Sequence, residues 1–104
     1  MIIYEVTSIV DTDAADEYRR WLAEHVVTML GFEGFDNAVI SALHEVEEGS
    51  RGFVVSYYLT DMAALDLYLA DNAAAMRADG QRLFGGRFTA TRRVHTILDA
   101  LGGD

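Results

Sequence analysis

The chain has 104 residues, enough for one domain with a hydrophobic core but not for two. It is 51% hydrophobic and contains neither proline nor cysteine, so disulfide bonds, thiolate metal sites and cysteine nucleophiles are excluded. Its net charge of −9 disfavours nucleic acids and anionic membranes as partners, because phosphate groups are bound by concentrated positive charge.

No apolar run approaches the roughly 20 residues that span a bilayer, and no basic and then apolar leader precedes the first predicted strand. We therefore expect a soluble, cytoplasmic protein that binds neither membranes nor nucleic acids. Five of the eight arginines lie between Arg77 and Arg93, where Asp79 is the only acidic residue. This segment predicts either an arginine-lined surface that offsets nearby acids or an anion-binding site.

The first elements in the chain are a strand and a helix. Residues 2–10 alternate between two faces, which predicts a strand. Asp11 and the two residues after it supply a cap and a negatively charged helix start, and Gly31 ends this helix after about Leu30. At 100° per residue, the inner stripe of the helix consists of Ala14, Tyr18, Trp21, Leu22, His25 and Met29.

The later elements continue the same order. We expect strands at residues 35–46, 51–59 and 88–98, a hairpin loop at residues 47–50, and a helical segment that begins at Thr60 or Asp61. Asn72 could cap a fresh helix, which would divide this segment in two. Residues 99–104 are expected to form a frayed end. The inner stripe of the helical segment is Leu65, Tyr68, Leu69, Asn72 and Met76.

An internal repeat supports this order of elements. The segment from Trp21 to Met29 recurs 47 positions later, from Tyr68 to Met76, as a duplicated strand–helix–strand unit would. The resulting β-α-β-β-α-β order predicts a ferredoxin-like α+β fold, with an antiparallel sheet of order 4-1-3-2 and both helices on one face. The same offset aligns residues 6–10 with residues 53–57 and turns Phe53 and Val55 toward the helices.

The opposite face of the sheet is then left open. It carries Ile3, Ile9, Val54, Tyr58 and Ile97, mixed with Glu5, Thr7, Thr91, Arg93 and His95. A small domain seldom leaves so apolar a face solvated. We therefore predict a homodimer in which this face packs on the same face of a second copy.

Several short segments carry a family resemblance: residues 1–7, Trp21, His25, Tyr68, Leu69, Met76, Arg77, Gly80, residues 84–88 and Arg92. With these segments and its element order, the chain resembles the dimeric α/β-barrel superfamily and, within it, a small bacterial family of unknown function. Residues 87–92 are the most specific part, and relatives often carry His-Ala where this chain has Asn72 and Ala73. The resemblance implies a single ferredoxin-like domain at residues 1–98 and a homodimer, and it brings no established activity.

Three polar side chains are predicted to point into one interior. His25 and Asn72 hold corresponding positions on the two inner stripes, and Arg92 lies on the helix-facing side of the last strand. Aromatic residues surround them: Tyr4, Tyr18, Trp21, Tyr57 and Tyr68. The group is either a satisfied polar network in a filled core or the polar part of a small-molecule pocket.

In the pocket hypothesis each residue has a role. His25 would transfer a proton near neutral pH, Arg92 would hold an anionic or enolate oxygen, and Asn72 would orient the ligand. Trp21, Tyr57 and Tyr68 would bind its apolar part.

No metal or cofactor is expected. His44 and His95 are predicted on the two edge strands, about 14 Å apart, which is too far for them to share an ion. Haem-degrading members of the superfamily place a histidine on the second helix, where this chain has none, so the resemblance does not extend to haem. RNA binding is disfavoured as well, because the offset turns Phe53 away from the open face on which an RNA base would stack.

Three functions stay open from the sequence. The first is a dimer that binds or senses a small apolar or weakly anionic metabolite. The second is a cofactor-independent enzyme of the α/β-barrel monooxygenase or isomerase type, with His25 as its acid or base. The third is a structural or protein-interaction dimer without a ligand.

Overall fold

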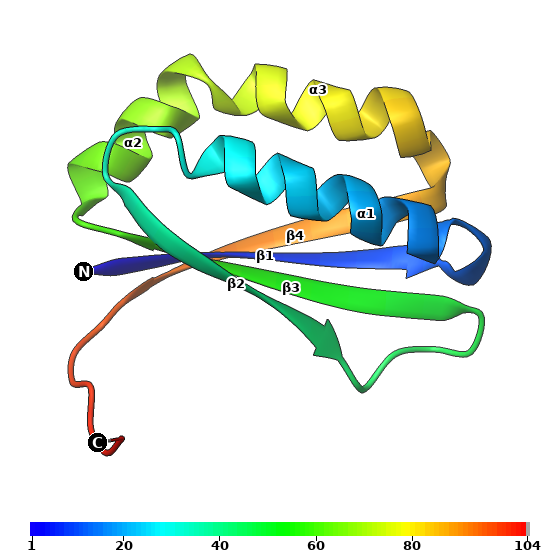
Figure 1. Cartoon of the computed structure of the whole chain (residues 1–104), viewed down its shortest axis with the longest axis horizontal. Coiled ribbons are helices and arrows are strands. Elements are labelled where there is room, and N and C mark those ends of the chain that lie inside the picture. Colours follow the sequence, from blue (N-terminus) through cyan, green and yellow to red (C-terminus); the bar gives the residue numbers. More distant parts are fainter. Residues whose placement is uncertain (104) are drawn as a thin grey trace.

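The computed structural model describes residues 1–103 and confirms the predicted fold. The elements are, in order, β1 (Ile2–Asp11), α1 (Thr12–Met29), β2 (Phe35–Leu43), β3 (Ser50–Leu59), α2 (Met62–Asp71), α3 (Ala73–Phe84), the 3-10 turn η1 (Gly85–Arg87) and β4 (Phe88–Thr96). The antiparallel strands lie in the order β2-β3-β1-β4, which is the predicted order. Figure 1 shows all three α-helices on one face of the sheet and the other face uncovered.

The core lies between the helices and the central strands. β1 and β3 pair along their whole length, with Val6 opposite Val55 and Tyr4 opposite Tyr57. Val10, Val55 and Tyr57 are almost fully buried on the helix-facing side, as the internal repeat predicts. Phe53 is also buried, and its ring stacks on the ring of Tyr18 in α1. The two halves of the repeat thus contribute one continuous floor beneath the helices.

Helix α1 begins where predicted, although its start is held differently. Asp11 occupies the cap position, yet its side chain makes no capping hydrogen bond. Instead, the backbone N–H of Thr12 donates to the carbonyl oxygen of Gly49 in the β2–β3 loop at 2.9 Å. The buried residues of the helix are Ala14, Ala15, Tyr18, Leu22, Val26 and Met29.

This buried set corrects the position of His25. The sequence places His25 at the centre of the inner stripe, whereas Val26 is buried and His25 is only half-buried beside Trp21. Both half-buried side chains lie at the edge of the stripe that faces α3. His25 is therefore placed at a boundary between core and solvent.

The second helical segment consists of two helices, one of the possibilities open from the sequence. The Asp61 side chain caps α2 by accepting the Ala64 N–H at 2.9 Å. Asn72 lies at the junction, but its side chain does not cap α3. The predicted stripe fails in part already within α2, where Leu65 and Tyr68 are buried but Leu69 is 40% exposed.

The sheet ends differ from their predicted bounds by a few residues. β2 stops at Leu43 and β4 at Thr96, before the expected ends at residues 46 and 98. Beyond β4, the Ile97 N–H donates to the Met1 carbonyl oxygen at 3.0 Å, and residues 98–103 form no regular element. Asp104, the end of the predicted frayed segment, lies outside the described residues.

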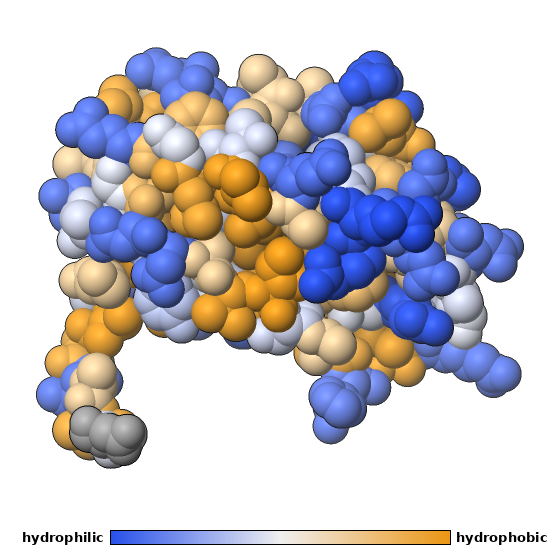
Figure 2. Space-filling view, viewed as in Figure 1, coloured by the Kyte–Doolittle hydropathy of each residue, from blue (hydrophilic) through white to orange (hydrophobic). Residues whose placement is uncertain are grey.

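The uncovered sheet face and the outer surface carry exposed apolar groups. Figure 2 shows apolar surface over the C-terminal half of α1 and over β2. Val27 of α1 and Val39 of β2 are 71% and 48% exposed. On the uncovered face, Arg93 of β4 forms an ion pair with Glu5 of β1 at 3.0 Å. Between residues 1 and 103, no helix is long and apolar enough to cross a membrane.

Candidate functional site

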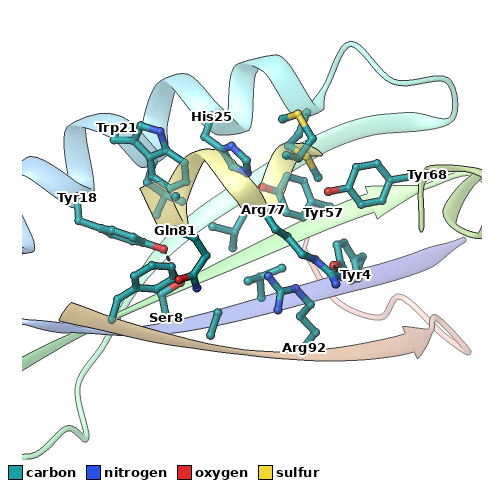
Figure 3. Close-up of a pocket in the computed structure, with 18 residues that line it drawn as sticks. Tyr4, Ser8, Tyr18, Trp21, His25, Tyr57, Tyr68, Arg77, Gln81 and Arg92 are labelled. Carbon is teal, nitrogen blue, oxygen red and sulfur yellow. Dashed lines mark hydrogen bonds between the residues drawn. The ribbon is translucent and has the colours of Figure 1, made fainter. Parts of the chain in front are cut away.

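A pocket of about 300 Å³ lies between the helices and the sheet. Its floor consists of β1, β3 and β4, its roof of α1 and α3, and Tyr68 of α2 contributes to its wall (Figure 3). Most of its walls are aromatic. The aromatic lining residues are Tyr4, Tyr18, Trp21, Tyr57, Tyr68 and Phe88.

The pocket opens between α3 and β4. Arg77, Gln81 and Arg92 are the lining residues that are exposed, and all three lie on these two elements. Within residues 1–103, no aspartate or glutamate lines the pocket. The mouth is therefore polar and positively charged, whereas the interior is mainly aromatic.

The Trp21 indole is fixed by α3. Its Nε1–H donates to Asp79 Oδ2 at 3.2 Å, and Asp79 also forms an ion pair with Arg82. Gly80 allows the helices to approach, since a Cβ at this position would lie 3.1 Å from the indole ring. The half-buried indole is thereby held as one wall of the pocket.

His25 lies in the same wall, one helical turn further along α1. Its ring stacks on Trp21 with the ring centres 4.6 Å apart and an interplanar angle of 24°. His25 lines the pocket on one side and, on the other, an outer groove that Glu24 and Asp79 also line. It therefore separates the aromatic interior from an acidic part of the surface.

The surroundings of His25 favour its neutral form. Burial lowers its pKa below the ordinary value of 6.5, Arg92 lowers it further, and Asp79 acts in the opposite direction. A neutral imidazole can accept a proton at pH 7. The geometry thus provides a potential base at the boundary of an aromatic pocket.

The lining tyrosines provide hydrogen-bonding groups. The Tyr18 hydroxyl donates to Ser8 Oγ at 2.7 Å, and the Tyr4 hydroxyl accepts a bond from Arg77 Nη2 at 3.1 Å. Burial raises the pKa of Tyr68 to about 12 and raises that of Tyr57 still further above its ordinary value. These two hydroxyls therefore stay protonated and can donate to a ligand.

The structure brings together most of the residues singled out from the sequence. Five of them line the same pocket: Trp21, His25, Tyr57, Tyr68 and Arg92. The exception is the residue expected to orient a ligand, Asn72, which is at the α2–α3 junction and does not line the pocket. The break between the helices removes it from the face that the repeat assigned to it.

Sequence reasoning missed Arg77 and Gln81 as pocket residues. A signal for Arg77 was present, because Ala73, Arg77, Gly80 and Phe84 share one face of a helix that begins at residue 73. The stripe continued from α2 predicts Met76, which does line the pocket, but not Arg77 beside it.

Solved structures with the same fold include proteins with oxygenase descriptions. A candidate antibiotic biosynthesis monooxygenase from Deinococcus radiodurans is 15% identical, with a TM-score of 0.77 and coverage of 100% of this chain and 99% of that one. SnoaB, a cofactor-independent oxygenase from Streptomyces nogalater, is 19% identical, with a TM-score of 0.71 and coverage of 98% of both chains. Identities this low show that the fold is shared.

Two further neighbours concern ligands and assembly. A variant of MhuD with manganese protoporphyrin IX in its active site is 20% identical, with a TM-score of 0.63 and coverage of 97% of this chain and 99% of that one. A protein described as a dimeric ferredoxin-like protein, from an uncultured marine organism, is 9% identical, with a TM-score of 0.71 and coverage of 96% and 98%.

The pocket fits a porphyrin poorly. Its volume of about 300 Å³ is small for a tetrapyrrole, since it lies at the lower end of the roughly 300–1,000 Å³ found for sites of drug-sized ligands. The single histidine among its described lining residues is His25, which is on α1 rather than on the second helical segment.

No curated protein matches the sequence significantly. A family model does match, and it covers residues 1–98, nearly the whole chain. The chain therefore belongs to the family described as "Domain of unknown function (DUF4286)".

Proposed function

We propose that this protein binds a small, largely aromatic metabolite in the pocket between its helices and sheet. The observation that carries the proposal is the cavity of about 300 Å³ with aromatic walls and a few polar groups at its mouth. Small-molecule sites commonly combine an apolar lining with a few placed polar groups. The oxygenase descriptions of proteins with the same fold support a site of this kind.

The cavity also argues against a purely structural dimer with a filled core. A pocket of this size leaves the side chains around it with fewer packing contacts than a filled core would give them. A ligand that fills it would supply the missing contacts.

Trp21 provides a direct test, because it is the only tryptophan in the chain and lines the pocket. We expect 2-naphthol or 2-naphthoate to change its fluorescence and to raise the melting temperature of the protein. Ala90→Leu adds bulk to the pocket wall and should weaken both effects. Ala74→Leu is the matched control, because Ala74 is exposed on α3 outside the pocket.

Two results would contradict pocket binding. One is that neither naphthalene derivative changes the fluorescence or the melting temperature. The other is that Ala90→Leu binds both compounds as tightly as the unchanged protein does, since a ligand in the pocket must compete with the added side chain.

A second candidate function is cofactor-independent proton transfer, and the neutral state of His25 specifically favours it. The imidazole would take a proton from an acidic C–H bond of the ligand, leaving an enolate and an imidazolium. Arg92 would hold the enolate oxygen. Return of the proton to another carbon completes an isomerisation. A delocalised enolate can instead add O2 at carbon, and the resulting peroxide takes the proton from the imidazolium to form a hydroperoxide. Loss of water from this hydroperoxide leaves a carbonyl group, so one oxygen atom of O2 enters the product and the other leaves as water.

The proton-transfer step can be measured without knowing the natural substrate. The protein should accelerate exchange of the α-protons of 2-tetralone with deuterium from D2O, followed by NMR. His25→Gln should lower the catalysed rate by about a hundredfold or more, as loss of a general base does. His44→Gln is the control, because His44 is exposed and does not line the pocket. Equal rates for His25→Gln and the unchanged protein would exclude this function.

The uncovered sheet face supports a homodimer as the form that binds the ligand. Ile3, Ile9, Val54 and Tyr58 on this face are only partly covered. The C-terminal segment projects beyond this face (Figure 1) and carries Leu98, which is 87% exposed. Packing of this face on a second copy would remove these apolar groups from water.

A further inference from the structure

Two of the chain's eight arginines line the pocket, and their pairing differs from that of two arginines close to them in sequence. Arg82 pairs with Asp79 and Arg93 with Glu5, whereas within residues 1–103 neither Arg77 nor Arg92 has a carboxylate partner. Both line the pocket mouth. The chain has 17 acidic residues, yet among the described residues none lines the pocket, whereas two arginines do.

The two guanidinium groups reach the same part of the pocket from different elements. Arg92 of β4 lies opposite Val6 of β1 in the sheet. Arg77 of α3 donates to the hydroxyl of Tyr4, which precedes Val6 by two residues on the same face of β1. Figure 3 shows both arginine side chains extending into the space between α3 and the sheet. Like charges that share one mouth repel each other unless an anion lies between them.

We propose that Arg77 and Arg92 form an anion subsite that holds the carboxylate of an aromatic or other ring-containing organic acid. The apolar ring of this acid would occupy the aromatic interior of the pocket. The inference rests on the proposed ligand-binding function and narrows the ligand to organic monoanions.

The rest of the pocket is suited to a carboxylate at this position. A guanidinium donates charge-assisted hydrogen bonds to carboxylates, and these are stronger than bonds between neutral groups. The neutral hydroxyls of Tyr57 and Tyr68 can donate further bonds deeper in the pocket. The overall charge of −9 opposes the approach of anions, but salt screens surface charges beyond about 8 Å under physiological conditions. At the mouth, the electrostatic attraction of Arg77 and Arg92 for an anion therefore outweighs the repulsion from distant acidic residues.

The test compares two ligands that share one ring system. Isothermal titration calorimetry and Trp21 fluorescence would measure the affinity for 2-naphthoate, which carries a carboxylate, and for 2-naphthol, which is neutral at pH 7. We expect 2-naphthoate to bind the full-length protein at least tenfold more tightly. Arg77→Gln and Arg92→Gln should each reduce the affinity for 2-naphthoate at least tenfold while changing that for 2-naphthol by less than twofold.

Arg20→Gln is the charge-matched control, since Arg20 is exposed on α1 outside the pocket. It should change neither affinity. Unchanged binding of 2-naphthol by the two pocket variants would show that the pocket remains folded.

The outcomes separate the subsite from the pocket itself. Equal affinity for the two compounds, or a loss of 2-naphthoate binding in Arg20→Gln as large as in the pocket variants, would overturn the anion subsite and leave the pocket proposal intact. Failure of the full-length protein to bind either compound would overturn both.

Discussion

Two neighbouring arginines on opposite faces of the sheet differ in whether they form an ion pair. Arg92 and Arg93 are adjacent on β4, so their side chains lie on opposite faces. On the uncovered face, Arg93 forms an ion pair with Glu5 across β1 and β4. On the helix-covered face, Arg92 lines a pocket in whose described lining there is no acid. Pairing indicates a structural role for Arg93, whereas the absence of pairing leaves Arg92 available to a ligand.

The same contrast holds for apolar side chains. Under the helices they are buried, with Val55 2% and Val10 0% exposed, and the pocket is the place where packing is incomplete. On the uncovered face, Val54 and Tyr58 keep part of their surface in water. One face thus has room for a small molecule, and the other has the extent and composition for a second protein chain.

The largest expected effect tests the uncovered face. Val54→Arg places a charge in the middle of the proposed dimer interface and should weaken association by about a hundredfold, or about 2.7 kcal/mol. Sedimentation velocity at micromolar concentration should then show the 11.5 kDa monomer instead of a dimer. Val27→Arg is the matched control, because Val27 is exposed on α1. A monomeric unchanged protein at this concentration would refute the dimer.

The covered face should be sensitive to loss of its buried hydrogen bond. Tyr18→Phe leaves the buried Ser8 hydroxyl without its partner and should lower the free energy of unfolding by about 1–3 kcal/mol. Urea unfolding measures this change. Ser8→Ala combined with Tyr18→Phe should recover part of the loss, and Tyr58→Phe on the uncovered face should have little effect. A Tyr18→Phe protein as stable as the parent would show that this bond contributes nothing.

The adjacent arginines should differ by a smaller amount. Arg93→Gln should cost no more than about 1 kcal/mol of stability, since its ion pair with Glu5 is largely at the surface. Arg92→Gln should cost nothing and could stabilise the protein by removing repulsion between unpaired cations. A double-mutant cycle with Glu5→Gln isolates the pair energy. If Arg92→Gln and Arg93→Gln lowered the free energy of unfolding equally, the proposed difference between a paired and an unpaired arginine would be wrong.

The smallest expected effect concerns His25 and depends on pH. At pH 7, His25→Gln should change stability by no more than about 0.5 kcal/mol if the residue lines a pocket. The pKa of His25 is lowered in the folded protein, so the unfolded chain takes up the proton first as the pH falls. The stability that neutral His25 contributes is present above pH 6.5 and is lost as the pH falls toward its lower folded pKa.

Two measurements check the behaviour of His25. Urea unfolding between pH 7.5 and 5 should show a shallower loss of stability for His25→Gln than for the unchanged protein. NMR titration should place the His25 midpoint below 6.5. Burial of the ring has the largest effect on this pKa and lowers it, while the charged groups that act on it are Asp79, which raises it, and Arg92, which lowers it. A midpoint above 6.5 would mean that Asp79 raises the pKa of His25 by more than burial and Arg92 lower it.

Most of the architecture could be predicted because it depends on local patterns. The alternation in β1 and the offset between Trp21 and Tyr68 were enough to predict the strand order and the helix-covered face. The differences lie in the second helical segment, which was treated as one inner stripe over residues 65–76. Tyr68 and Met76 of this stripe line the pocket, whereas Asn72 is at the junction between two helices and Leu69 of α2 is 40% exposed.

Sequence patterns alone were enough to predict the fold, the face on which the helices pack, and an aromatic interior near His25 and Arg92. These features follow from periodicity and from the repeat, which act over a few residues or between matched units. Three features of the site became visible only in the folded chain: the interior contains a pocket, Arg77 lies with Arg92 at its mouth, and Asn72 does not line it. Those outcomes depend on how closely α1, α3 and β4 approach one another. Packing between elements sets that approach, and no single segment encodes it.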